Sequence, residues 1–435
     1  MHSQEFAKRR RQFLSMIGRN GVAILPAAPE RPRNKDTLYP YRQDSDFYYL
    51  TGFGEPESVA VFVPGRSKGE FLLFCRDRDP LREQWDGPRA GQEGATAQYG
   101  ADDAFPIADI DEILPGILEP SERVYYSVGT HAEFDQRVLG WLGLLRARGQ
   151  SAHVPDELVT LDHLLHELRL LKSRREVAAL RRAAKIAVEA HRRAMSVVKP
   201  GIYEYELEAE LSYVFRKENA VNSYSPIVAA GRNACVLHYI ANDQRIQDGD
   251  LVLIDAGCEY DMYASDITRT FPANGRFSRS QRDIYTIVAG AQAAAIDKVR
   301  PGNHWNDPHD AAVKVITRGL RDVGILKGRL PSLIKSEAYR PYFMHRTGHW
   351  LGMDVHDVGD YKVEDHWRLL EPGMVMTVEP GLYLPAGQRG LAKKWQGIGV
   401  RIEDDVLVTR AGPDTLTAGL PTSADEVEAF MASLR

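Results

Sequence analysis

The pattern of apolar and polar positions predicts two regions of different texture along the chain. In residues 1–150, short β-rich runs alternate with helical stretches. The predicted strands are VAILP, FYYLTGF, SVAVFVPG, EFLLFC and RVYYSVG, and the segment DQRVLGWLGLLRARG is a predicted helix. Phe6, Phe13, Leu14 and Ile17 recur at helical spacing and predict a further helix near the N-terminus. This alternation is an α/β pattern.

The second region begins with a long helix. Ser173 and Glu176 form a capping-box pattern, and Pro200-Gly201 ends the apolar stripe that follows. Further predicted helices are YEYELEAELSYVFRKEN, residues 280–299, residues 309–323 and a short C-terminal segment. The predicted strands are SPIVAAG, DLVLIDAG, DITRTFPA, VMTVEPGLYL and GIGVRIEDDVLVT.

Together the two textures predict an α/β (α+β) protein of two domains, residues 1–170 and residues 171–435. A polar stretch, residues 146–157, is a candidate linker. We find no internal repeat and no low-complexity segment.

Composition narrows the classes of protein. The 435 residues carry a formal net charge of −5 and are 43% hydrophobic, which argues against a disordered chain and against a nucleic-acid-binding protein. Arg19 and Asn20 interrupt the only candidate signal segment, and no run reaches the ~18 apolar residues that a membrane span needs. The three cysteines are scattered, so we expect a reducing compartment, the cytoplasm, and no interaction with membranes.

Two aspartates flank a predicted hairpin. Asp255 ends one apolar strand and Asp266 opens the next. If the turn is centred on Tyr260 and Asp261, the two aspartates are cross-strand neighbours with Cβ atoms about 5 Å apart. Two buried carboxylates at that distance repel each other, so that one binds a proton or a cation lies between them. The alternative is a pair of loop aspartates at strand ends.

A second candidate segment is HRTGHWLGMDVHD, which contains three histidines. His345, His349 and His356 lie within twelve positions, and Gly348 and Gly352 separate them. The glycines argue against a helical zinc-binding face and favour a backbone that bends to bring the side chains together. Isolated histidines, by contrast, are ordinary surface or core residues.

Two glutamates lie in otherwise apolar strand patterns. Glu379 is costly to bury unless it is paired or binds a metal. Arg401 and Glu403 share a face of their predicted strand because side chains alternate along it. An ordinary Arg–Glu pair on the surface of an edge strand is the alternative for that second segment.

The candidates combine into one charge-balanced set: Asp255, Asp266, His349, Glu379 and Glu403. Two divalent cations would balance the four carboxylates. Oxygen-rich ligation favours harder ions, most readily Mn²⁺, over a thiolate-type zinc site. Two metals ~3.5–4 Å apart activate one water and polarise a carbonyl.

The motifs that carry this set resemble those of a known family. The spacing of the two aspartates, followed by GHWLGMDVHD, TVEPG and VRIEDD, is similar to the proline-peptidase group of dinuclear metallopeptidases. The segment YPYRQDSDFYYLTGFGEPES resembles the N-terminal domain of aminopeptidase P. The resemblance spans nearly the whole chain and implies a pita-bread catalytic domain at residues 171–435.

The resemblance also implies a reaction, release of the N-terminal residue from Xaa-Pro peptides by attack of a hydroxide that bridges the metals. It implies that Asp255 binds one metal, that Asp266 and Glu403 bridge both, and that His349 and Glu379 bind the other. Glu379 is the candidate for proton transfer. The remaining residues implied to act on the substrate are His238 and His356 at the tetrahedral intermediate, His345, Tyr383 and Arg401 at the proline side, and Trp85 and Asp36 at the rim or at a neighbouring subunit's site.

Several alternatives stay open at this point. A prolidase, which takes only Xaa-Pro dipeptides, has the same metal ligands. A non-catalytic pita-bread protein would lack some of the metal ligands, and none is missing here. Creatinase chemistry uses no metal, so the intact ligand set argues against it. The large N-terminal domain argues against a methionine aminopeptidase. Family resemblance implies a homodimer or homotetramer.

Overall fold

The computed structural model describes residues 3–434 and divides into two compact units, Met1–Leu168 and Arg169–Arg435. Residues 146–157, the candidate linker, lie inside the first unit, from the end of the helix Ala132–Ala147 to the first residue of the strand Glu157–Val159. Within the part of the chain that the structure describes, no helix has the length and apolar character that crossing a membrane requires.

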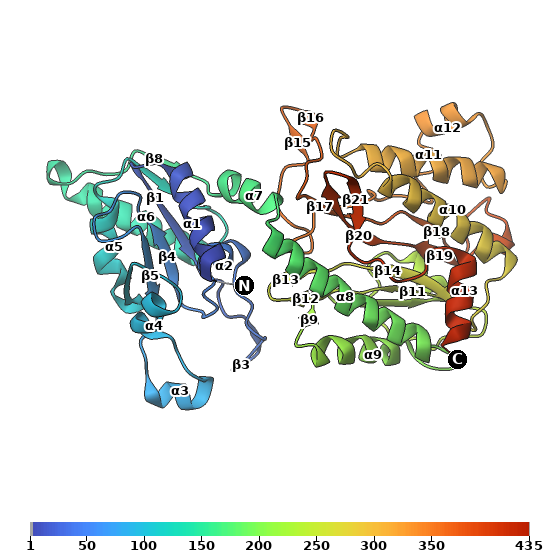
Figure 1. Ribbon diagram of the computed structural model, residues 1–435, viewed down its shortest axis with the longest axis horizontal. Coiled ribbons are helices and arrows are strands. Elements are labelled where there is room, and N and C mark those ends of the chain that lie inside the picture. The colour runs from blue at the N-terminus through green and yellow to red at the C-terminus, as the bar shows by residue number, and fades with distance from the viewer. Residues whose placement is uncertain (1–2, 435) are drawn as a thin grey trace. The chain divides into compact units, whose positions relative to one another are not determined.

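The first unit is built on one six-stranded mixed sheet of order β6-β5-β4-β1-β7-β8 (Figure 1). β1 pairs antiparallel with β4 and parallel with β7. The strands are β1 (Gly21–Pro26), β4 (Val59–Phe62), β5 (Phe71–Cys75), β6 (Asp103–Pro106), β7 (Arg123–Tyr125) and β8 (Glu157–Val159), with a separate hairpin of β2 (Pro32–Asn34) and β3 (Thr37–Leu38). The helices are α1 (Ser3–Ile17), α2 (Ser45–Thr51), α3 (Pro80–Asp86), α4 (Gly91–Ala97), α5 (Ile110–Leu118) and α6 (Ala132–Ala147). Helix α7 (Asp162–Leu170) begins in the first unit, and its last two residues belong to the second.

Alternate side chains of this sheet bury against helices on its two faces. Ile24 packs with Leu114 of α5 and Trp141 of α6 in one apolar cluster. On the other face, Phe13 of α1 meets the ring of Phe62 edge-on, with centroids 5.4 Å apart, which is within the range of favourable aromatic pairs. The predicted N-terminal helix is therefore confirmed as α1.

The segment FYYLTGF forms a helix, α2, and not the predicted strand. The Asp44 side chain caps the helix by accepting a hydrogen bond from the backbone N–H of Phe47. Gly52, at φ 67°, ends it in the left-handed conformation that glycine adopts without strain. Both caps lie at the edges of the aromatic run, so aromatic content alone gave the wrong prediction.

The second unit contains short antiparallel sheets covered by long helices. Its sheets have the orders β10-β11-β14, β13-β12-β9, β17-β20-β21, β18-β19 and β15-β16. The strands are β9 (Val221–Asn222), β10 (Ile227–Ala230), β11 (Leu251–Asp255), β12 (Cys258–Tyr260), β13 (Tyr263–Ala264), β14 (Thr268–Pro272), β15 (Lys362–Val363), β16 (His366–Trp367), β17 (Val375–Val378), β18 (Gly381–Leu384), β19 (Ile398–Arg401), β20 (Asp404–Thr409) and β21 (Gly412–Thr415). The helices are α8 (Arg174–Val197), α9 (Glu204–Lys217), α10 (Arg279–Ile296), α11 (Asp307–Asp322), α12 (Leu330–Lys335) and α13 (Ala424–Ser433).

Long helices and strands share one apolar core in this unit. Ala187 of α8, Val288 of α10 and Ile254 of β11 are all fully buried in it. The predicted capping box of α8 is confirmed: the Ser173 hydroxyl accepts from the backbone of Glu176, whose carboxylate accepts from the backbone of Ser173. Helix α8 packs against β12 and β13, and α9 packs against β9 and β10 (both helices green in Figure 1). Helix α10 packs against β17, β18 and β19 and against α11.

The hairpin that carries the two aspartates has a register two residues away from the predicted one. Asp255 lies opposite Thr268, and Asp266 does not face it directly. The reason is the turn, where Asp261 and Met262 both have positive φ, at 52° and 68°. Such a two-residue turn matches the strand twist and fixes the centre of the hairpin between these residues. Because the shift is even, both aspartates still project from the same face.

Candidate metal centre

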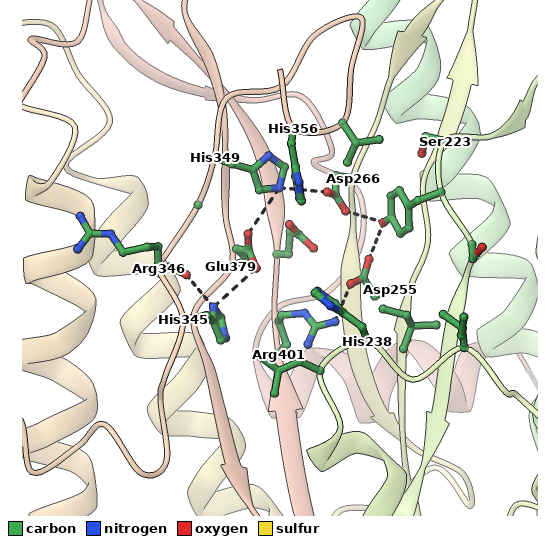
Figure 2. A pocket seen from close by; sticks show the side chains of 18 of the residues that line it. Ser223, His238, Asp255, Asp266, His345, Arg346, His349, His356, Glu379 and Arg401 are labelled. Atoms are coloured by element: carbon green, nitrogen blue, oxygen red, sulfur yellow. Dashed lines mark hydrogen bonds and ion pairs between the residues drawn. The ribbon is translucent and has the colours of Figure 1, made fainter. Parts of the chain in front are cut away.

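A cavity of about 910 Å³ in the second unit gathers most of the predicted site residues (Figure 2). It is lined by all five candidate ligands, Asp255, Asp266, His349, Glu379 and Glu403, and by the five candidate substrate residues His238, His345, His356, Tyr383 and Arg401. These residues are spread over 166 positions of sequence. The strands among them meet at one place, formed by the ends of β11, β17, β18 and β19 and the starts of β14 and β20.

Tyr224 joins the two aspartates, and no sequence pattern singled it out. Its hydroxyl lies 2.5 Å from Oδ1 of Asp255 and 2.5 Å from Oδ1 of Asp266. A hydroxyl has one proton to donate, so it can satisfy only one of two charged carboxylates at a time. Burial raises the pKa of the Tyr224 hydroxyl, and the two aspartates raise it further. The tyrosine therefore stays protonated as a neutral bridge.

Backbone pairing places His349 beside Glu379. Glu379 N–H donates to the carbonyl of Thr347, and Thr377 N–H donates to the carbonyl of His349, so the histidine segment extends the edge of β17. At Gly348, a Cβ would lie 2.0 Å from the Thr377 carbonyl oxygen, which only glycine avoids. Gly348 therefore serves a close approach of two backbones, whereas the sequence pattern predicted a bend at this glycine.

His349 points its Nε2 atom at the carboxylates. Nδ1 lies 2.9 Å from the Trp350 carbonyl, which can only accept, so Nδ1 carries a proton. Nε2 is 3.3 Å from Asp266 Oδ2 and 3.6 Å from Glu379 Oε1. Burial alone lowers the pKa of His349, but the two carboxylates outweigh it and raise the pKa to about 9. In this arrangement the imidazolium serves as the counter-charge of the carboxylates.

Burial close to one another changes the pKa values of the carboxylates. Burial and the neighbouring acids raise the pKa of Glu403 and of Asp255 above the usual range. Burial raises the pKa of Glu379 to about 7. Acidic groups with raised pKa values, packed around a histidine, are an environment that a multivalent cation relieves.

A directed chain of hydrogen bonds forms the opposite wall. Arg401 donates to Oδ2 of Asp255 at 2.6 Å and to the Tyr383 hydroxyl oxygen at 2.9 Å. The Tyr383 hydroxyl lies 2.9 Å from Nε2 of His345. His345 Nδ1 lies 2.7 Å from the Arg346 carbonyl and donates to it, so Nε2 accepts from Tyr383. Burial lowers the pKa of His345 to about 4, which keeps it neutral in this chain.

The alternative of a surface pair at Arg401 and Glu403 is wrong, because their exposed fractions are 4% and 2%. Thr268, a residue that sequence patterns did not single out, lies between them. Its hydroxyl donates to Glu403 Oε2 at 2.6 Å and accepts from Arg401 Nε at 3.1 Å. The threonine orients both side chains, and threonine in a strand is too common to attract attention.

The four remaining candidates divide by unit. His238 and His356 are exposed and line the cavity of the second unit, and the His356 ring meets the His349 ring edge-on at 4.3 Å. Trp85, in α3, is 86% exposed, and Asp36 is exposed between β2 and β3. Both belong to the first unit, and neither lines the cavity.

The donor set fits divalent metal ions. One ligand atom from each of Asp266, His349 and Glu403 lies within 4.8 Å of the others, and Asp255 and Glu379 flank this trio. Oxygen atoms dominate and no cysteine lines the cavity, which suits hard or borderline cations. Nε2 is the His349 atom that faces the carboxylates, because Nδ1 donates to a carbonyl, and a cation bound at Nε2 would displace the second proton of the imidazolium.

The sequence matches two described protein families. The pattern of metallopeptidase family M24 matches residues 178–410, and that of the aminopeptidase P N-terminal domain matches residues 6–125. The chain belongs to metallopeptidase family M24. This confirms the resemblance drawn from the motifs, with its pita-bread catalytic domain after an aminopeptidase P N-terminal domain.

The relatives of this M24 metallopeptidase span its whole length. Xaa-Pro aminopeptidase of Escherichia coli (strain K12) is 44% identical over 99% of this chain and 98% of the relative. The structure of Pseudomonas aeruginosa aminopeptidase PepP is similar with a TM-score of 0.99 and 58% identity, covering 100% of this chain and 99% of that one. Aminopeptidase P from Escherichia coli with the inhibitor Pro-Leu is similar with a TM-score of 0.97 and 44% identity, at 100% and 99% coverage.

Proposed function

We propose that this M24 metallopeptidase is a Xaa-Pro aminopeptidase that releases the N-terminal residue of peptides with proline at the second position. The observation that carries the proposal is the grouping of four carboxylates, each buried or at most one-fifth exposed, with His349 at one cavity, beside the chain Arg401–Tyr383–His345. Full-length similarity to named Xaa-Pro aminopeptidases favours this function over prolidase.

The five ligand candidates hold two divalent ions in the proposal, with Mn²⁺ as the preferred metal. Asp255 would hold one ion, His349 and Glu379 the other, and Asp266 and Glu403 would contribute to both. Bound cations supply an activated water and polarise the scissile carbonyl. Glu379 takes the proton of the attacking water on a carboxylate oxygen and returns it to the leaving proline nitrogen.

The substrate residues act on either side of the scissile bond. Proline lacks an N–H and has a fixed φ, so recognition depends on the shape of the pocket and not on a hydrogen bond to that nitrogen. We assign His345, Tyr383 and Arg401 to the proline side, where their hydrogen-bond chain fixes a rigid wall. His238 and His356, on exposed loops at the cavity, donate to the carbonyl oxygen as negative charge develops on it.

The first unit contributes through its exposed residues. We propose that Trp85 and Asp36 act at the rim of a site, their own or that of a neighbouring copy in a homodimer or homotetramer. Trp85 is 86% exposed, so its ring is accessible for such a contact. A cytoplasmic location is consistent with three cysteines that form no disulfide.

The test compares two substrates with purified protein and Mn²⁺. A Xaa-Pro-Xaa tripeptide and the matching Xaa-Pro dipeptide are incubated at equal concentration, and release of the first residue is followed by chromatography. We expect cleavage of the tripeptide, with an Ala-Ala-Xaa peptide as the control that remains intact. Cleavage of the dipeptide alone would replace the proposal with a prolidase.

A further inference from the structure

Four charged residues, three of them buried, form a cluster beside the cavity, and the proposed reaction does not use it. Arg169 and Lys172 lie where the second unit begins, and Asp354 and Asp357 lie in the loop after His349. Arg169 Nη2 is 2.7 Å from Asp354 Oδ2 and 2.6 Å from Asp357 Oδ1. Lys172 Nζ is 2.8 Å from Asp357 Oδ2.

Burial of these charged groups costs solvation free energy. The side chains of Lys172 and Asp357 are each 1% exposed, and that of Arg169 is 3% exposed. Two cations and two carboxylates balance, which is the condition under which buried charges are tolerated. Burial alone would raise the pKa of Asp357, but Lys172 and Arg169 outweigh it and lower the pKa, so the carboxylate stays charged.

The cluster fixes both oxygens of Asp357. Oδ1 accepts from Arg169 and Oδ2 from Lys172, so the carboxylate can neither rotate nor shift without losing a charged hydrogen bond. The Asp357 backbone is held too, because its N–H donates to the Trp350 carbonyl at 2.9 Å. Residue 357 is therefore fixed through both its side chain and its main chain.

The loop is shaped to admit this carboxylate. A Cβ at Gly352 would lie 2.0 Å from Asp357 Oδ2 and 3.0 Å from Cε of Lys172. The Gly352 carbonyl accepts from the backbone of Ala264, which joins the loop to the aspartate hairpin. The second glycine of the histidine segment thus leaves room for the Lys172–Asp357 pair.

His356 directly precedes the fixed residue. Its side chain is exposed, and its ring meets the His349 ring at 4.3 Å. An exposed imidazole on a loop needs a rigid backbone if it is to stay within a few tenths of an ångström of a reacting carbonyl. The anchored Asp357 supplies that rigidity one residue away.

We propose that Lys172 and Arg169 are positioning residues that fix His356 through the carboxylate of Asp357. The proposal rests on the role given to His356 above. It assigns a task in the reaction to the segment that begins the second unit, far from the ligands in sequence.

A double-mutant cycle tests this coupling. Lys172→Met is made in the parent enzyme and in the His356→Ala variant, and kcat and KM are measured on a Xaa-Pro-Xaa peptide with Mn²⁺. We expect Lys172→Met to lower kcat about tenfold with little change in KM in the parent, and less than about twofold in the His356→Ala background. Equal losses in both backgrounds would overturn the proposal, because Lys172 would then act without His356.

Two further variants separate positioning from stability. The pair Lys172→Met with Asp357→Asn keeps the cluster neutral and protects the fold, and we expect it to retain the loss in kcat; full activity in this variant would contradict the proposal. Lys185→Met, at an exposed position on α8, is the matched control and keeps the parent kcat.

Hydrogen exchange gives a readout that does not depend on catalysis. The amide of Asp357 is protected by its bond to Trp350, so we expect Lys172→Met to speed exchange in residues 350–358 and to leave α8 unchanged. Unchanged exchange would refute the anchoring itself. Faster exchange in an enzyme that cleaves no Xaa-Pro peptide would instead refute the proposed function and leave the anchor in place.

Discussion

At the scale of single residues, Tyr224 shows how a neutral group holds charged ligands in place. Its hydroxyl lies at hydrogen-bonding distance from both Asp255 and Asp266, which repel each other when charged. Groups that orient metal ligands from behind commonly change metal affinity by 10–100-fold when they are removed. The hydroxyl therefore has a measurable share in binding the metal.

Tyr224→Phe is predicted to weaken metal binding by about tenfold, because the two aspartates lose the donor that fixes their rotamers. The measurement is the Mn²⁺ concentration that restores half of full activity after chelation. Tyr213→Phe, at an exposed position of α9, is the control. A half-saturating concentration identical to that of the parent would exclude this role for Tyr224.

Residue type decided which side chains the sequence could reveal. Glu379 was predictable because a carboxylate in an apolar strand must be paired or bound, and the structure places it in the cavity. Tyr224 and Thr268 were not, since a tyrosine in a loop and a threonine in a strand are ordinary. Their function is visible only in the distances to Asp255 and Glu403.

At the scale of elements, helix α8 supports the strand that ends in Asp255. His191, fully buried in α8, donates from Nε2 to the carbonyl of Ala256 at 3.0 Å. Burial lowers the pKa of His191 to about 4. Because the unfolded chain binds the proton near pH 6.5, the native contribution of this neutral histidine is complete above pH 6.5 and decreases as the pH falls towards 4.

His191→Gln is predicted to remove this part of the acid sensitivity. Glutamine keeps a donor for the Ala256 carbonyl and does not titrate, so the loss of stability between pH 6.5 and 4 is smaller by up to about 3 kcal/mol. Urea unfolding at several pH values measures it. His153→Gln, at an exposed position, is the control, and an unchanged pH slope in His191→Gln would contradict the account.

The elements themselves were predictable where one signal dominated. The capping box of α8 and the apolar strand β11 agree with the sequence patterns. Helix α2 does not agree with the predicted strand. Its aromatic run favours a strand, but its ends favour a helix, and the caps at Asp44 and Gly52 determine that a helix forms. The hairpin register needed the turn geometry at Asp261 and Met262, which apolar patterning does not specify.

At the scale of the whole molecule, each unit has its own apolar core. Leu114 and Trp141 belong to the core of the first unit, and Ala187 and Val288 to that of the second. The candidate ligands all lie in the second unit. Units with separate cores are able to unfold in separate steps, so a ligand of one unit stabilises that unit alone.

Metal removal is therefore predicted to lower the unfolding temperature of the second unit only. At a free metal concentration 1,000 times Kd, the bound ion contributes about 4 kcal/mol. Calorimetry with Mn²⁺ and with a chelator measures it. Leu114→Ala, which opens a cavity in the first core, identifies the other transition by lowering it. A single transition that moves with both changes would contradict separate unfolding.

The turn at Asp261 and Met262 also limits how this chain can vary in length. Successive side chains of a strand project from opposite faces, so adding one residue to a strand of the hairpin would turn Asp266 away from Asp255. Adding two would restore the face. Length changes between these aspartates are therefore tolerated in even numbers. A single inserted residue would still allow the hairpin to fold, but its two aspartates would no longer share a face.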